Sequence, residues 1–209
     1  MTDDRLTQDW ISNEWNNPAY QEVKKNNFLA LDSYLKNSPT TILDIGCGLA
    51  WESRRFNEKY KTKLWLIDGD VTNNNLKDNT AKDVNYHTSA NEFLYYNSLD
   101  RLDAELKKLG TTDFTLLDCN NLKLPYIKFD LITSWLSCGF HYPVSTYAAI
   151  IKKHSHRDTR IVFDLRTHIK TKEIILEDCF EVVSIIGTTG KLGKSVTAEI
   201  RLKRLNHLN

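Results

Sequence analysis

The sequence predicts an α/β protein built on a single doubly wound, mostly parallel sheet. Short apolar runs alternate with segments of helical periodicity, which is the pattern of strands joined by crossover helices. The first run, 41–45, leads through a glycine turn into a helix-forming segment, the corner at which such folds bind nucleotides. Two β-rich runs, 180–186 and 196–202, are separated by glycines and indicate a C-terminal hairpin.

Residues 1–38 form an N-terminal helical extension ahead of a predicted domain of residues 39–209. Asn17 suits the N-cap of a helix and Pro18 suits its first turn. Apolar residues then recur near helical spacing, so we expect this helix to pack one face on the sheet. Trp10 and Trp15 come earlier, and two interpretations stay open for them, core packing or part of a lid over the ligand.

The first strand ends in a carboxylate and two glycines. Gly46 and Gly48 lack a Cβ, which lets the backbone turn sharply and a ligand approach closely. A helix is expected from Trp51, with its free N–H groups facing the same crevice. A dinucleotide fingerprint requires a small residue where Trp51 stands, and this disfavours a nucleotide-dependent oxidoreductase.

Further acids follow the next two predicted strands. Asp68 directly follows the run 63–67 and lies 20 residues after Gly48, near the offset of a ribose-binding acid. Asp70 competes for this role. Asp118 follows the run 114–117 in the same way. The remaining expected elements are helices at 89–109, 144–153 and 171–179 and strands at 129–134 and 160–165.

The stretch Asp44-Ile-Gly46-Cys-Gly48-Leu-Ala50 resembles motif I of the class I S-adenosylmethionine (SAM)-dependent methyltransferases, D/E-x-G-x-G-x-G, with Ala50 in the last glycine's place. Leu124-Pro125 followed by Phe129-Asp-Leu-Ile132 is similar to a second phrase of that family. The resemblance covers roughly residues 40–204. It implies a seven-stranded sheet whose last strand is antiparallel, with SAM as the cofactor.

The resemblance also implies which residues contact SAM. The motif I carboxylate suits the sulfonium and ammonium of SAM, Asp68 would accept hydrogen bonds from the ribose, and Asp118 and Cys119 would face the adenine. The implied cofactor-binding set is Asp44, Gly46, Cys47, Gly48, Asp68, Asp118, Cys119 and Ser134.

The acceptor is expected beside the aromatic segment 135–143, because ligands bind beyond the carboxyl ends of parallel strands. His141 is the best-placed general base for a hydroxyl acceptor, and its ordinary pKa suits proton transfer near neutral pH. Trp135, His141 and Tyr142 are the candidate substrate-binding residues, and His141 as a pocket wall stays an alternative. No N/D-P-P-Y motif follows Ser134 and no proline precedes Cys138, which disfavours nitrogen and cytosine-carbon acceptors.

Composition limits the remaining function classes. The net charge is +1, from 28 basic and 27 acidic residues, and gives no global reason to bind nucleic acid or a membrane. No apolar run could span a bilayer, no metal cluster is expected, and the four cysteines are scattered. We therefore expect a cytoplasmic methyltransferase for a small-molecule acceptor such as a sugar-like hydroxyl. A nucleic-acid or protein methyltransferase and a non-catalytic SAM-binding partner subunit remain the alternatives.

Overall fold

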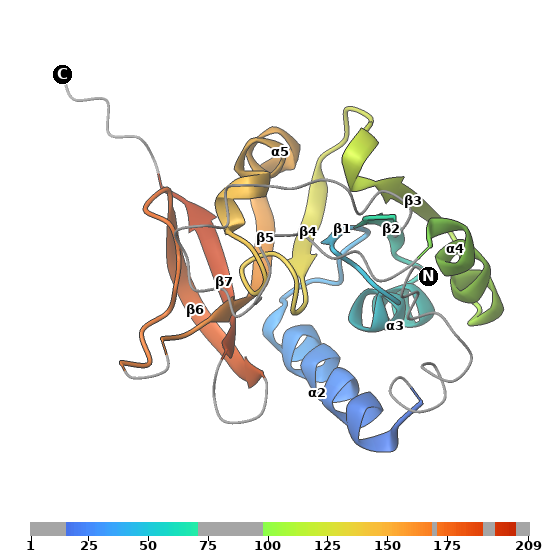
Figure 1. Cartoon of the computed structure of the whole chain (residues 1–209), viewed down its shortest axis with the longest axis horizontal. Helices are drawn as coiled ribbons and strands as arrows, with labels where there is room; N and C mark the ends of the chain where they lie inside the picture. Colours follow the sequence, from blue (N-terminus) through green and yellow to red (C-terminus); the bar gives the residue numbers. More distant parts are fainter. Residues whose placement is uncertain (1–15, 71–97, 169–170, 190–194, 204–209) are drawn as a thin grey trace.

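A computed structural model describes residues 16–70, 98–168, 171–189 and 195–203. Its strands form a single mixed sheet that is flanked by helices (Figure 1). In chain order they are α2 (Pro18–Tyr34), β1 (Thr41–Ile45), α3 (Trp51–Tyr60), β2 (Lys63–Asp68), α4 (Leu99–Lys108), β3 (Phe114–Asp118), the 3₁₀ turn η4 (Cys119–Asn121), β4 (Phe129–Ser134), the 3₁₀ turn η5 (Val144–Tyr147), α5 (Ala148–His154), β5 (Ser155–Arg166), β6 (Phe180–Thr189) and β7 (Ser195–Leu202).

The sheet has seven strands in the order β3-β2-β1-β4-β5-β7-β6. The first five strands pair in parallel, whereas β7 is antiparallel to both β5 and β6. The predicted doubly wound sheet with an antiparallel hairpin strand is therefore confirmed. The strand order reverses between β1 and β4, which is the point where open α/β sheets bind ligands.

Two hydrophobic clusters cover the two faces of the sheet. One joins α2, α3 and α4 to the sheet through residues such as Phe28, Phe56 and Leu102. The other lies on the face of α5 and includes Ile151 and Phe163. Figure 1 shows α2, α3 and α4 on one side and α5 on the other. The central strands β1 and β2 are buried on both faces, which explains their continuous apolar runs.

Most helix boundaries agree with the sequence signals. Asn17 caps α2 by accepting a hydrogen bond from the Ala19 amide, with Pro18 at the first helical position. Gly110, at φ +78°, follows the end of α4. The part of the predicted helix before residue 98, the polar segment 71–82, and Trp10 and Trp15 lie outside the described residues.

The expected helix at 171–179 is wrong, because this segment is an extended connection from β5 to β6. Ile174 forms an antiparallel bridge with Thr167, and the Ile175 amide donates to the Arg166 carbonyl. Lys172 has a positive φ of +62°, which a right-handed helix does not allow. The apolar residues that suggested a helix instead cover the end of β5.

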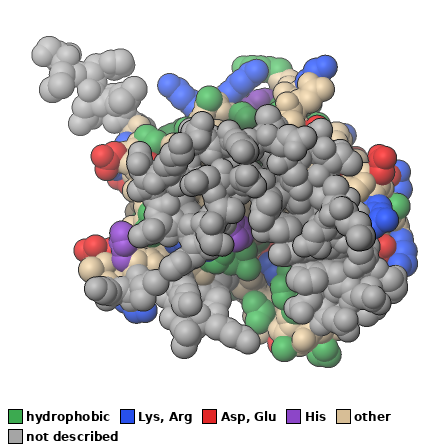
Figure 2. All heavy atoms as spheres, in the orientation of Figure 1, with side chains coloured by type: hydrophobic (Ala, Val, Ile, Leu, Met, Phe, Trp, Pro, Cys, Tyr) green, Lys and Arg blue, Asp and Glu red, His purple; other side chains and the backbone are tan. Residues whose placement is uncertain are grey.

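None of the helices in the described ranges is long and apolar enough to cross a membrane. Charges of both signs occur side by side at the right-hand rim of the molecule in Figure 2.

Candidate functional site

The glycine turn after β1 is fixed to the neighbouring strand. The amides of Gly46 and Cys47 both donate to the carbonyl of Ile67 in β2, at 2.8 and 2.9 Å. Gly46 and Gly48 have φ values of +67° and +51°, and Ala50 at +48° leads into α3. The left-handed conformation of the two glycines explains why this sequence carries glycine there. The turn thus lies at the carboxyl edge of the sheet, at the start of α3.

Asp68, at the end of β2, is tied to this turn. Its Oδ2 accepts a hydrogen bond from the Gly48 amide at 2.6 Å, and its Oδ1 accepts one from Gly69 at 2.8 Å. Burial raises the pKa of Asp68, although these hydrogen bonds oppose the shift. The Cys47 thiol lies 3.8 Å from Asp68 Oδ2, and its pKa is raised by burial and by that carboxylate. Cys47 is therefore a neutral thiol here, not a nucleophile.

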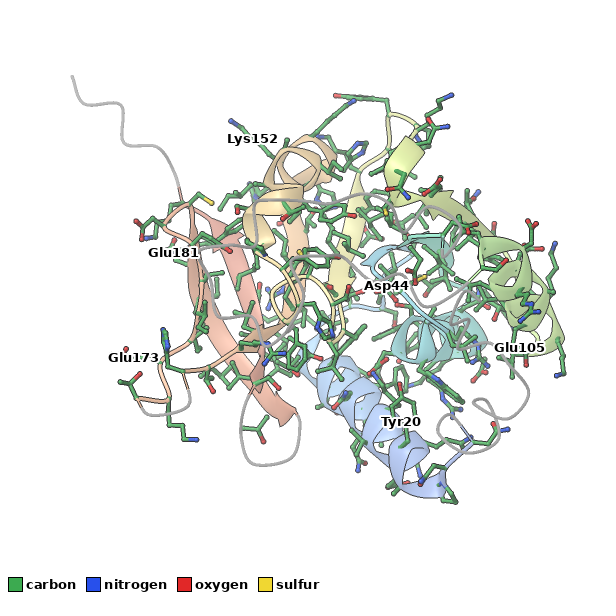
Figure 3. The ribbon with its side chains drawn as sticks, in the orientation of Figure 1. Tyr20, Asp44, Glu105, Lys152, Glu173 and Glu181 are labelled. Carbon is green, nitrogen blue, oxygen red and sulfur yellow. The ribbon has the colours of Figure 1, made fainter. Side chains whose placement is uncertain are left out.

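Asp44 is fully buried near the centre of the molecule (Figure 3). Its Oδ2 accepts a hydrogen bond from the Ser53 hydroxyl at 2.7 Å, whereas Oδ1 has no normal hydrogen-bond partner among the described residues. Thr133, its neighbour on β4, makes only a weaker contact. Burial raises the pKa of Asp44 to about 7, with a further contribution from Glu52. A buried acceptor left in this state costs stability, and it suits a cationic or hydrogen-bonding ligand.

A buried ion pair connects α2 with α3 beside Asp44. Lys24 Nζ lies 2.9 Å from Glu52 Oε1, and the Asn27 side-chain amide donates to the same oxygen at 3.0 Å. Burial by itself lowers the pKa of Lys24, but Glu52 outweighs this effect and the pKa is raised. Asp164 on β5 also acts electrostatically on Lys24. The buried cation of Lys24 therefore lies among the carboxyl groups of Glu52, Asp44 and Asp164.

The carboxyl ends of β2 and β3 bring two predicted acids together. Asp68 and Asp118 are register partners in the parallel pair. Asp118 Oδ1 accepts a hydrogen bond from the Asn120 amide at 2.9 Å and so caps η4, the short turn that contains Cys119. Asp118 and Cys119 are both partly exposed, so their side chains are accessible from the carboxyl edge.

Ser134, at the end of β4, joins the strands on either side of the switch point. Its hydroxyl donates to the Ile45 carbonyl at 2.7 Å and accepts from the Cys138 amide at 2.8 Å. The side chain is fully buried. Its hydroxyl therefore holds β1, β4 and the following loop together, and a direct cofactor contact stays a prediction.

The loop after β4 folds back over the glycine turn. The Ser137 hydroxyl and the Tyr142 hydroxyl lie 3.1 Å apart. A Cβ built on Gly46 would lie 1.8 Å from Ser137 Oγ and 3.4 Å from Tyr142 Oη. Burial raises the pKa of Tyr142 well above its ordinary value, so the phenol stays protonated. Gly46 is required here because this loop occupies the place of a side chain.

His141 and Trp135, the other two residues predicted to bind the methyl acceptor, differ in burial. His141 is partly exposed, its amide donates to the Ser137 carbonyl, and its ring meets Phe140 edge-on at 5.0 Å. Trp135 is only 8 % exposed and belongs to the core cluster on the α2 side. Most of its surface packs in the core, and its role in an acceptor pocket stays a prediction.

Sequence reasoning missed Lys24, Glu52, Ser137 and Asp164 as components of this region. Lys24 lies in a helix outside the recognised motif, and its burial depends on how α2 docks. Glu52 has one local signal, an acid in the first turn of the helix after the glycines. Asp164, in turn, accepts hydrogen bonds from the Leu136 amide and the Thr197 hydroxyl, which come from distant parts of the chain. Only tertiary structure brings these residues together.

In the described ranges, no group of three or more histidine, cysteine or acidic side chains has a geometry that could hold a metal ion. His154 Nδ1 lies 2.8 Å from the Ile127 carbonyl, and His156 is 3.5 Å from Asp130. The two histidines thus have different partners.

No protein-family model and no curated protein sequence matches this chain. Solved structures do match. The ribosomal protein L11 methylase of Lactobacillus delbrueckii subsp. bulgaricus is 14% identical with a TM-score of 0.51, over 90% of this chain and 81% of that one. A point mutant of MtNAS in complex with S-adenosylmethionine is 9% identical with a TM-score of 0.57, over 94% and 67%. The putative methyltransferase yhhF from Escherichia coli is 9% identical with a TM-score of 0.53, over 90% and 87%.

The chain therefore has the fold of the class I SAM-dependent methyltransferases. The sheet order β3-β2-β1-β4-β5-β7-β6 with antiparallel β7 is typical of that class. At these identities the likeness extends to the fold, and the chemistry must be argued from the site.

Proposed function

We propose that the protein is a SAM-dependent methyltransferase that acts on a small-molecule acceptor. The single observation that carries the proposal is the buried carboxyl of Asp44, whose Oδ1 has no normal hydrogen-bond partner in the described part of the chain. It lies close in sequence to Gly48, where no atom of the described residues would lie within 4 Å of a Cβ, so a ligand can approach the backbone there. Together with the acid excess around Lys24, it favours a ligand whose inner end is cationic.

The same electrostatics argue against a dinucleotide. A pyrophosphate would need to approach the first turn of α3. Glu52 is buried in that turn, and Asp44 and Asp68 flank it. Lys24 is already paired with Glu52, so it leaves no free cation for two phosphate charges, and the nearby carboxyl of Asp68 would repel them. The ammonium and sulfonium of SAM would instead be attracted. Trp51 opposes the dinucleotide on steric grounds as well.

The residues present fit SAM in one orientation. At β3, Asp118 and Cys119 would hold the adenine. At β2, Asp68 would hold the ribose. At β1, the turn from Asp44 to Gly48 would hold the methionine end. Bound SAM supplies a methyl group on a sulfonium for in-line displacement. The residues of this chain would orient the acceptor, exclude water and receive a proton.

We further propose that the acceptor atom is a hydroxyl oxygen and that His141 receives its proton. His141 is partly exposed in the loop that follows β4, on the acceptor side of the switch point. Tyr142 cannot act as a base near neutral pH, because burial raises the pKa of its phenol well above the usual 10. His141 is the histidine of this loop, and histidine is the side-chain type best suited to accept a proton near neutral pH.

Calorimetry with SAM, S-adenosylhomocysteine (SAH) and NAD tests the cofactor. We expect binding of the first two and none of NAD, and NAD binding without SAM binding would contradict the proposal. Acceptors are then screened by SAM consumption with sugars, phenols and small amines. SAM binding without transfer to any acceptor class would favour the non-catalytic partner subunit instead.

His141→Ala should lower turnover by roughly 10²–10⁴-fold and leave SAM affinity nearly unchanged, if His141 is the general base. A loss confined to the acceptor KM would make His141 a pocket wall. His156→Ala is the matched control, since that histidine pairs with Asp130. Near wild-type turnover in both variants would remove His141 from the chemistry.

A further inference from the structure

The Ser137 and Tyr142 hydroxyls form a partly buried polar pair that joins the two ends of the loop after β4. Their oxygens are 3.1 Å apart, so they share one hydrogen bond. Both lie against Gly46, and Ser137 Oγ stands where a side chain on that glycine would be. Because Gly46 has no side chain, both oxygens lie against the backbone of the ligand turn.

The pair lies at the switch point of the sheet. Gly46 directly follows β1, and Ser137 is three residues beyond the end of β4. In the orientation of SAM proposed above, the adenine lies at β3 and the ribose at β2. The sulfur and the methionine tail then lie at β1 and β4, beside these hydroxyls. Asp68 acts electrostatically on Tyr142, which places the phenol near the ribose-side acid as well.

The chemistry of the pair suits a cation. Each hydroxyl oxygen carries two acceptor lone pairs and one proton, and one of the two protons lies between the oxygens. Both groups are neutral near pH 7, because burial keeps the phenol of Tyr142 protonated. Neutral hydroxyl oxygens attract a sulfonium and the polarised hydrogens of its methyl group, whereas a neutral thioether gains little from them.

We propose that the Ser137–Tyr142 hydroxyl pair contacts the sulfonium end of SAM and makes the site discriminate SAM, the substrate form, from SAH, the product. The inference rests on the proposed function and adds two specificity-determining residues to it. A pair that favours the charged form also promotes release of the product, since the attraction disappears when the methyl group leaves.

The test compares the affinities of wild type, Tyr142→Phe and Ser137→Ala for SAM, SAH and sinefungin by calorimetry. Sinefungin carries an amine in place of the sulfonium and should behave like SAM. We expect Tyr142→Phe to weaken binding of SAM and sinefungin by about 10-fold, close to the lower end of the range for hydrogen bonds to charged groups, and to leave SAH affinity within about 3-fold. Ser137→Ala should act in the same direction with a smaller effect.

Tyr147→Phe is the matched control. Its ring lies 6.2 Å from that of Tyr142, and its hydroxyl is not part of the pair. It should leave the ratio of SAM to SAH affinity unchanged. Thermal unfolding of each variant checks that the loop remains folded.

Equal losses for SAM and SAH in Tyr142→Phe would show a packing role and overturn the inference while leaving the proposed function in place. Unchanged affinities for all three ligands would overturn it in the same way. If wild type bound neither SAM nor SAH, the proposed function itself would fall, together with this inference.

Discussion

The buried carboxyl of Asp44 connects the stability of this protein with its proposed ligand. Taking a carboxylate out of water raises its pKa, and the Ser53 hydroxyl, Lys24 and Thr133 oppose this effect without cancelling it. The group thus stays largely protonated up to about pH 7 in the folded chain. A ligand ammonium placed beside it would lower that pKa, so binding of SAM at a pH just below that pKa should release a proton.

The stability of the folded chain should therefore carry a contribution from Asp44 that falls with rising pH. The pKa is 3.8 in the unfolded chain and about 7 when folded. Between these values the unfolded state loses its proton first, so the contribution is complete below about pH 4 and lost as the pH rises through about 7. The loss amounts to roughly 2–4 kcal/mol. Urea unfolding of wild type and Asp44→Asn from about pH 4 to about pH 8 measures it as the difference between the two curves.

Asp130→Asn provides the opposite control. Hydrogen bonds from Thr40 and Thr41 outweigh partial burial and lower the pKa of Asp130. Its contribution to stability is present above about pH 4 and lost as the pH falls. If the Asp44→Asn curve ran parallel to that of wild type over the same pH range, Asp44 would be ionised in the folded chain.

Asp68→Ala should weaken SAM binding by about 1.5–3 kcal/mol, because it removes hydrogen bonds to a charged acceptor. The loss has a second source, since Asp68 also holds the Gly48 amide and so shapes the ligand turn. Asp70→Ala is the control. Asp70 accepts a long hydrogen bond of 3.4 Å from the Leu99 amide at the start of α4. A larger loss for Asp70→Ala than for Asp68→Ala, measured by calorimetry, would reverse the assignment.

At the level of elements, the turn between β1 and α3 offers a matched pair of glycines. Gly46 and Gly48 both have positive φ, so alanine at either position costs about 1 kcal/mol from the backbone. Only at Gly46 would the new Cβ collide, at 1.8 Å from Ser137 Oγ and 2.5 Å from Ser137 Cβ. Nothing in the described residues lies within 4 Å of a Cβ on Gly48.

Gly46→Ala should therefore destabilise the protein by at least about 1 kcal/mol more than Gly48→Ala, and it should also displace the loop that carries Tyr142. Chemical denaturation of both variants measures the difference. Adding Ser137→Gly should recover part of the loss in Gly46→Ala, since it vacates the colliding atoms. Equal destabilisation by the two alanines would mean that the loop moves away at little cost.

The connection from β5 to β6 shows how the sequence pattern of a segment can predict the wrong secondary structure. Residues 171–179 have apolar positions compatible with a helical face, yet they form an extended strip along β5. Ile174 and Leu176 pack against the core cluster of that sheet face. An extended segment that covers the end of a strand and a short buried helix require similar apolar patterns over so short a stretch, so periodicity alone does not decide between them.

At the level of the whole molecule, α2 is packed as part of the domain core. Phe28 is 7% exposed, and its ring meets that of Phe56 edge-on at 4.9 Å. Lys24 adds the buried ion pair to Glu52. Because these contacts join α2 to the helix that follows the ligand turn, folding of α2 and shaping of the site should be coupled.

We expect Phe28→Ala to cost about 3–5 kcal/mol, as for other aromatic side chains removed from a core. Leu29→Ala, one residue away and 45% exposed, is the control and should change stability by less than about 0.5 kcal/mol. Unfolding followed by circular dichroism and by tryptophan fluorescence should give one coincident transition. An early transition that removes helix content before the tryptophan signal changes would make α2 an independent unit.

The sheet and the ligand turn follow from local features of the sequence. Strands such as 41–45 and 63–68 are buried on both faces, so their apolar runs identify them, and the glycines and acids at their ends are local requirements of the turn. The burial of Lys24 beside Glu52, the contact of Ser137 with Gly46 and the raised pKa of Asp44 depend on tertiary structure. These depend on how elements distant in the chain pack, and the pKa of Asp44 follows from the water that packing excludes.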